Sequence, residues 1–186
     1  MSILGVDPGL NATGYGVIEA QGTRLVVVEA GTIRPSARQS LAQRLLSLYN
    51  ALAQVIDTHR PSLTVLESLY THHEYLTTST LMAHARGVAC LLSAQRGLTV
   101  VEYLPTRVKK ALTGYGTASK EQVARMVGQW LGRSDASWSS DATDALALAI
   151  AHVHVSQHGI AQPSRKGHRR RVLAALVDGQ IPRRAG

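Results

Sequence analysis

Residues 2–9 read Ser-Ile-Leu-Gly-Val-Asp-Pro-Gly, a short apolar run that ends in an acid and then in a turn. Such a run predicts a buried strand that stops at the Pro-Gly turn. Two further β-rich segments follow at 14–19 and 25–30, and Gln-Gly-Thr at 21–23 separates them. We therefore expect three strands joined as antiparallel hairpins.

Beyond these strands, helical periodicity alternates with short apolar runs. Ser40 is a candidate N-cap of a long amphipathic helix, which should end at about Arg60 because Pro61 follows. Residues 63–67 and 98–102 are apolar runs that again end in an acid. Other helices are expected at 77–96 with Gly97 as the cap, at 106–112, at 119–131 and at 141–156. This order predicts one α/β domain, a mixed five-stranded sheet flanked by helices.

The net charge of +8 is unevenly distributed along the chain. Residues 159–186 hold seven Lys or Arg and one acid, whereas residues 1–158 hold 13 basic and 11 acidic side chains. We expect a near-neutral domain at 1–158 and a basic, flexible tail at 159–186. If four acids of the domain bind metal ions, the remaining charge is positive enough for a phosphate-binding face.

Cysteine usage and hydropathy bear on the compartment. Cys90 is the only cysteine, so no intramolecular disulfide can form, and its apolar helical surroundings predict a buried, inert thiol. The N-terminus lacks a basic segment followed by an apolar run and a cleavage site. No window approaches ~18 uninterrupted apolar residues. We expect a soluble, cytoplasmic protein without a membrane segment.

Four carboxylates are placed to meet. Asp7 and Glu67 each end a predicted buried strand, and ligands bind at such strand ends in open α/β sheets. Asp141 and Asp144 are three residues apart at a helix start, so both can point to one side. Clustered carboxylates repel one another unless a cation is present. Hard oxygen ligands favour Mg²⁺ or Mn²⁺, and two such ions suit phosphodiester hydrolysis.

Each acid also has a plainer interpretation when it is taken alone. Asp7 before Pro-Gly suits a turn, and Glu67 suits a surface acid at the end of a strand. Asp141 could be an N-cap, and Asp144 could be an acid that the helix dipole favours.

These acids stand in motifs that resemble the RuvC family of bacterial Holliday junction resolvases. The motifs are 5–9 (Gly-Val-Asp-Pro-Gly), 13–16 (Thr-Gly-Tyr-Gly), Glu67 and 141–147 (Asp-Ala-Thr-Asp-Ala-Leu-Ala). The likeness continues through 85–88, 105–109, 114–116 and 152–156, and so covers nearly all of residues 1–158.

The resemblance implies an RNase H-like fold and an endonuclease that resolves four-way DNA junctions by paired nicks. In-line attack by a metal-activated water predicts a 5′-phosphate and a 3′-hydroxyl at each nick. It implies two Mg²⁺ or Mn²⁺ ions per active site, held by the four carboxylates. It further implies a homodimer with its contact on the helix at 77–96, since a two-fold dimer presents one site to each of two strands. Partnership with the RuvA–RuvB branch-migration complex is implied in the same way.

The segment after Glu67 resembles the part of the family that carries a stacking aromatic. Tyr70 falls at that position, where phenylalanine is common, and its ring would stack on a base at an opened junction. Leu69 is an alternative wedge, and a half-buried tyrosine at a strand end is the structural alternative. We interpret His72 and His73 as an exposed loop pair rather than as metal ligands.

Basic residues of the next helical segments also match family positions. Lys109 and Lys120 would hold the scissile phosphate or stabilise the charge that builds up on it. Arg107, Lys110 and Arg125 add positive charge, and a solvated basic face is the alternative for all five.

Three other functions compete with this interpretation. An actin-like or sugar-kinase-like ATPase would need a second phosphate loop and an adenosine site, for which 186 residues leave no space. An RNase H-like nuclease with another substrate, such as RNA, has the same composition. A binding module without catalysis would explain the basic face but not four gathered acids.

Overall fold

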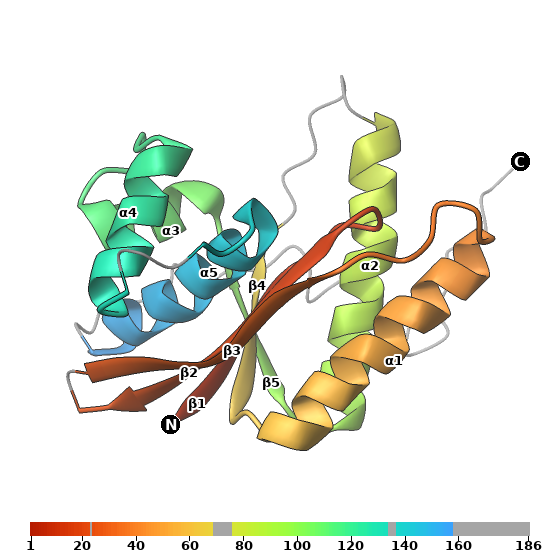
Figure 1. The fold of residues 1–186 in the computed structure, drawn as a ribbon, viewed down its shortest axis with the longest axis horizontal. Coiled ribbons are helices and arrows are strands. Elements are labelled where there is room, and N and C mark those ends of the chain that lie inside the picture. The colour runs from red at the N-terminus through yellow and green to blue at the C-terminus, as the bar shows by residue number, and fades with distance from the viewer. Residues whose placement is uncertain (23, 69–75, 134–136, 158–186) are drawn as a thin grey trace, which may run out of the picture.

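The computed structural model describes residues 1–22, 24–68, 76–133 and 137–157. In this part of the chain five strands form one sheet in the order β3-β2-β1-β4-β5 (Figure 1). The strands are β1 (Ser2–Asp7), β2 (Thr13–Gln21), β3 (Arg24–Ile33), β4 (Leu63–Glu67) and β5 (Thr99–Tyr103). β2 pairs antiparallel with β1 and β3, and β4 pairs parallel with β1 and β5. The predicted hairpins and mixed α/β sheet are confirmed.

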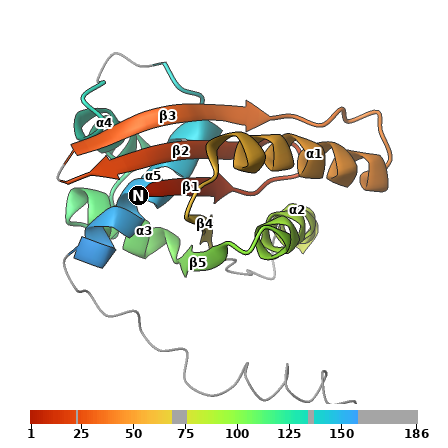
Figure 2. The same cartoon turned by 90° about the horizontal axis from the view of Figure 1, so that it is seen from below.

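Helices cover both faces of the sheet (Figures 1 and 2). On one face α1 (Leu41–His59) and α2 (Leu76–Gln95) enclose a core with Leu4 and Val6 of β1. On the other face α5 (Ser140–Gln157) lies across the strands, and α3 (Pro105–Thr113) and α4 (Lys120–Trp130) pack beside it. Ile3 points to this second core. Successive strand residues therefore serve opposite cores, as the period of two requires.

The structure confirms several of the predicted helix ends. Ser40 and Ser119 each form a capping box, with Gln43 and Gln122 respectively. Arg60 adopts a left-handed conformation directly before Pro61 and ends α1. Gly97, with φ at +69°, follows α2 as expected. These boundaries depend on local chemistry, which is why the sequence alone predicts them.

One prediction about burial needs correction, and several others concern residues outside the described ranges. Cys90 is half-buried rather than buried, and burial raises the pKa of its thiol, so it stays protonated near neutral pH. Within the described ranges no helix combines the length and apolar character that crossing a bilayer requires. The predictions for Tyr70, Leu69, His72 and His73, and for the tail at 159–186, lie outside the described residues.

Candidate active site

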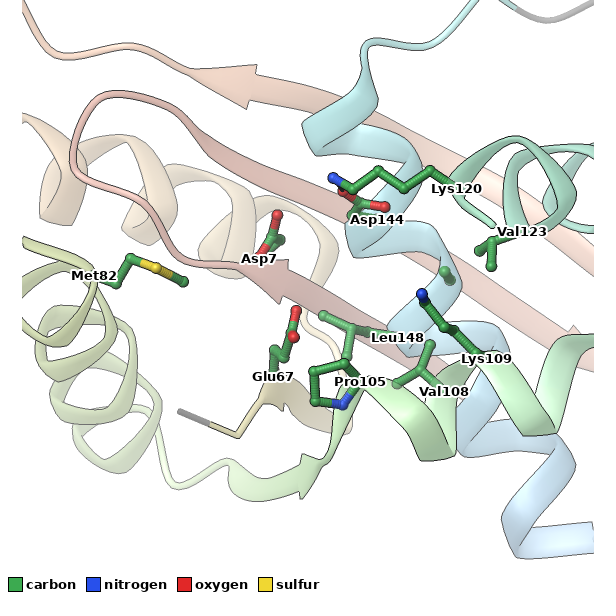
Figure 3. A pocket seen from close by; sticks show the side chains of 11 residues that line it. Asp7, Glu67, Met82, Pro105, Val108, Lys109, Lys120, Val123, Asp144 and Leu148 are labelled. Carbon is green, nitrogen blue, oxygen red and sulfur yellow. Dashed lines mark hydrogen bonds and ion pairs between the residues drawn. The ribbon is translucent and has the colours of Figure 1, made fainter. Parts of the chain in front are cut away.

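Asp7 and Glu67 lie side by side at one edge of the sheet. β1 and β4 are parallel neighbours whose register pairs Val6 with Leu66, so the residues that follow are adjacent as well. Both side chains are half-buried and point to the same side of the strand ends (Figure 3). The parallel pairing thus brings together two acids that are far apart in the sequence.

The N-terminal part of α5 supplies the other two acids, Asp141 in the first turn and Asp144 just after it. Ser139 caps this helix, because its Oγ accepts a hydrogen bond from the amide of Ala142 at 3.2 Å. Asp141 is therefore not the N-cap, and the helix begins one residue earlier than expected, at Ser140. Since Ser139 performs the capping, the carboxylates of Asp141 and Asp144 are available for other contacts.

Glycines of β1 and β2 let α5 approach the sheet. A Cβ atom on Gly5 would lie 2.0 Å from the carbonyl oxygen of Ala145, and one on Gly14 would lie 1.8 Å from that of Asp141. At Gly16 it would lie 2.6 Å from the Leu146 side chain. No other residue fits at Gly5 or Gly14 without moving the helix that carries Asp141 and Asp144. The resemblance includes these glycines, but the sequence does not reveal this reason for them.

Three of the acids and two lysines line a single pocket of about 360 Å³ (Figure 3). The acids are Asp7, Glu67 and Asp144, and the lysines are Lys109 and Lys120. The remaining wall is mainly apolar and consists of Met82, Pro105, Val108, Val123, Ala147 and Leu148. The pocket draws on β1, β4, α2, α3, α4 and α5 and could not be assembled from any one segment.

Burial and repulsion by neighbouring carboxylates raise the pKa values of Asp7 and Glu67. The pKa of Asp7 is raised to about 6, first by burial and then by the charges of Asp144 and Asp141. The pKa of Glu67 is raised to about 7, first by burial and then by Asp7 and Asp144. Lys120 opposes both shifts. A cation in the pocket would relieve this repulsion.

Two of the acids already have basic partners. The Lys120 ammonium donates to Asp144 at 3.3 Å, and the Arg34 guanidinium donates to Asp141 at 3.0 Å. In the described part of the chain no three acidic, histidine or cysteine side chains lie close enough together to hold a metal ion as they stand. The donor set fits a hard divalent cation. Binding one would require side-chain rotation, and Asp144 and Asp141 would first have to leave Lys120 and Arg34.

Comparison with known proteins gives the same assignment as the motifs. The family model for crossover junction endodeoxyribonuclease RuvC matches residues 3–152. This chain belongs to the RuvC family. RuvC of Rhodopirellula baltica is 41% identical over 160 residues, which are 86% of this chain and 90% of that protein. RuvC of Azorhizobium caulinodans is 45% identical over 152 residues, covering 82% and 89% of the two chains.

Solved structures agree with the family assignment. The structure of T. thermophilus RuvC in complex with a Holliday junction substrate matches with a TM-score of 0.81 and 28% identity, over 88% of this chain and 99% of that one. The yeast mitochondrial Holliday junction resolvase Ydc2 matches with a TM-score of 0.55 at 11% identity, over 84% and 82% of the two chains, and supports the fold alone. The RNase H-like fold is therefore confirmed.

Three further basic residues that were expected to add positive charge do not line the pocket, namely Arg107, Lys110 and Arg125. Arg107 is half-buried, and its guanidinium lies 5.4 Å from the centre of the Tyr103 ring. Lys110 is exposed on α3, one residue beyond Lys109. Arg107 thus packs against the protein itself, whereas Lys110 is free to meet a phosphate in solution.

Sequence reasoning missed the residues that fix the start of α5. Arg34 follows β3 directly and pairs with Asp141, and Thr32 hydrogen-bonds to Ser139 at 2.5 Å through their hydroxyls. No motif or periodicity marks Arg34 or Thr32 as part of a site, because their contacts with the start of α5 exist only once α5 crosses the sheet. His152 on α5 packs within the protein, with Nδ1 3.0 Å from the Tyr103 hydroxyl.

Proposed function

We propose that this chain is a metal-dependent endonuclease that resolves four-way DNA junctions. The observation that carries the proposal is the single pocket at the ends of β1 and β4, where Asp7, Glu67 and Asp144 face Lys109 and Lys120. Relatives that align over most of this chain are crossover junction endodeoxyribonucleases. Negative and positive groups in one pocket suit a phosphodiester that is bound through metal ions.

Asp7, Glu67, Asp141 and Asp144 would hold Mg²⁺ or Mn²⁺, two ions per active site. When bound, the ions supply an activated water and stabilise the leaving oxygen. The raised pKa values of Asp7 and Glu67 support this assignment. They show that the carboxylates repel one another, and a bound cation would offset that repulsion.

The lysines and the apolar wall would act on the DNA. Lys120 pairs with Asp144. With a cation bound at Asp144, Lys120 would be available to bind the scissile phosphate. Lys109 also lines the pocket and would hold a second phosphate oxygen. Met82, Val108 and Leu148 limit the water around the reacting phosphate, which strengthens both charge interactions. The product would carry a 5′-phosphate and a 3′-hydroxyl.

The outward face of α2 suits a homodimer. Ala85, Ala89 and Leu92 are buried in the core beside α1, whereas Leu91 is 57% exposed. A Cβ on Gly87 would meet nothing within 4 Å, so a partner helix could approach closely there. A two-fold dimer through this face would nick two symmetric strands. We further propose that the protein acts in the cytoplasm together with the RuvA–RuvB branch-migration complex.

The decisive experiment is incubation of the protein with a synthetic four-way junction, with the nicks mapped on each strand. We expect paired nicks at symmetric positions in Mg²⁺ or Mn²⁺ and none in EDTA. Asp7→Asn should abolish cleavage yet still bind the junction, because the lysines that contact phosphates remain. Metal-dependent cleavage by Asp7→Asn would contradict the assignment.

The same experiment separates the competing functions. The RNA nuclease predicts cleavage of an RNA four-way junction, and the relatives, all named deoxyribonucleases, do not support it. A binding module predicts junction binding without nicks at any metal concentration. We expect DNA cleavage to be much the faster reaction.

A further inference from the structure

The loop between α3 and α4 presents an aromatic ring to solvent. Tyr115 is 74% exposed, more than any other large hydrophobic residue among those that the structure describes. A single exposed hydrophobic residue is common and needs no function. Two features distinguish Tyr115 from an ordinary exposed residue. Its backbone is held by hydrogen bonds, and the helices on either side of its loop carry the lysines of the pocket.

The backbone of Tyr115 is fixed although its ring is exposed. Gly114, with φ at +84°, ends α3 in a conformation that favours glycine. The Thr113 hydroxyl oxygen accepts a hydrogen bond from the Tyr115 amide at 3.1 Å. The same hydroxyl lies within hydrogen-bonding distance, 3.0 Å, of the Tyr115 carbonyl oxygen. Buried Ala118 donates its amide to that carbonyl at 3.4 Å. The ring is therefore displayed from a constrained position.

In the chain this loop lies between the two lysines of the pocket, and it packs close to the pocket wall. It joins the helix that carries Lys109 to the helix that begins with Lys120, and both lysines line the pocket. A Cβ on Gly116 would lie 3.2 Å from the Thr106 carbonyl oxygen, so the loop packs against the first turn of α3. Pro105 of that turn also lines the pocket. DNA held by the two lysines would pass close to the loop.

We propose that the Tyr115 ring stacks on a nucleobase of the junction next to the strand that is cut. The inference rests on the proposed function, since it needs DNA in the pocket. Lysines position a DNA backbone without contacting its bases, whereas an aromatic ring offers a face to any unpaired base. A tyrosine on a fixed backbone also loses little conformational entropy on binding. Tyr115 would thus hold an opened base and position the strand that enters the pocket.

Junction-binding titrations without divalent metal test this proposal. The junction carries 2-aminopurine, whose fluorescence falls on stacking, at successive positions around the branch point. We expect wild type to quench one position, and Tyr115→Ala to lose that quench and bind about tenfold more weakly. Tyr115→Phe should match wild type, because the ring and not the hydroxyl makes the contact.

Lys110→Ala is the matched control from the neighbouring helix. This change removes one positive charge that would contact a phosphate. The slope of log Kd against the logarithm of the salt concentration should therefore fall by about one. Tyr115→Ala should leave the salt dependence unchanged.

Two results would overturn the inference. The first is binding and quenching by Tyr115→Ala that equal those of wild type. The second is a loss in Tyr115→Phe as large as that in Tyr115→Ala, which would assign the contact to the hydroxyl. Cleavage of the same junction by wild type in Mg²⁺ tests the proposed function separately. If wild type cleaves and Tyr115→Ala binds normally, only this inference fails.

Discussion

The two faces of the sheet are packed in different ways. On the α5 face, Gly5 and Gly14 bring strand backbone against helix backbone. On the α1–α2 face, large side chains such as Leu48, Leu52 and Leu92 fill the space between sheet and helices. Side chains can repack, whereas two backbones in contact cannot move apart without shifting a whole element. The acids of α5 lie on the face where the helix position is fixed.

The largest difference between the faces should appear when one strand carboxylate is neutralised on each. Glu67→Gln should lower the cleavage rate by more than roughly a hundredfold, since even residues that support a metal ligand contribute 10- to 100-fold. Glu29→Gln is the control on the α1 side, where Glu29 binds Tyr15 and His59. It should cleave at close to the wild-type rate. Single-turnover rates on a four-way junction measure both, and equal losses would contradict the assignment of the site.

Packing changes should separate fixed from adaptable contacts. Gly5→Ala should lower the free energy of unfolding by about 3 kcal/mol, because its methyl group would overlap the Ala145 carbonyl. Leu48→Ala should cost a similar ~3 kcal/mol by leaving a cavity. At a temperature where both are folded, only Gly5→Ala should lose cleavage, since it displaces α5. Urea unfolding and cleavage at 20 °C measure this pair, and full activity in Gly5→Ala would show that α5 adapts.

A smaller effect is expected in the pH dependence of the metal-free protein. The pKa of Asp7 is about 6 in the folded state against 3.8 in the reference state. Between these values the folded state holds more protons than the unfolded state, so stability falls as pH rises. Asp7→Asn should therefore melt a few degrees above wild type at pH 8 in EDTA. The difference should vanish near pH 4.

Calorimetry with and without Mg²⁺ checks this expectation. Mg²⁺ should raise the melting temperature of wild type at pH 8 and should affect Asp7→Asn less, since binding to the folded state stabilises it. A lower melting temperature of Asp7→Asn at pH 8 would contradict the repulsion between the carboxylates.

The smallest effect is expected for an exposed ion pair on the α1–α2 face. Arg96 donates to both carboxylate oxygens of Asp57, at 2.7 and 2.8 Å, and joins the ends of the two helices. Because exposed pairs are screened by solvent, Arg96→Gln should change neither cleavage nor melting temperature appreciably. A clear loss of cleavage would mean that this face also contributes to the site.

Local chemistry explains which parts of the structure were predictable. The apolar run before Asp7 and the caps at Ser40 and Ser119 depend on neighbours in sequence, and the structure has them where expected. The alternative interpretation of Asp141 as an N-cap is wrong, because Ser139 caps α5, and local sequence does not separate the two since both are good capping residues. Nothing in the sequence near Arg34 or Asp141 predicts their ion pair, because the two residues are far apart in the chain.

The sequence by itself determined the order of strands and helices, the acids at their ends and the family to which the chain belongs. Only the tertiary structure decided that Asp7 and Glu67 are neighbours, that α5 approaches through the glycines and that Arg34 and Lys120 pair with Asp141 and Asp144. The reason is physical. Strands and caps form from interactions between residues close in sequence, whereas parallel pairing and helix crossing depend on contacts between distant segments that form only in the folded chain.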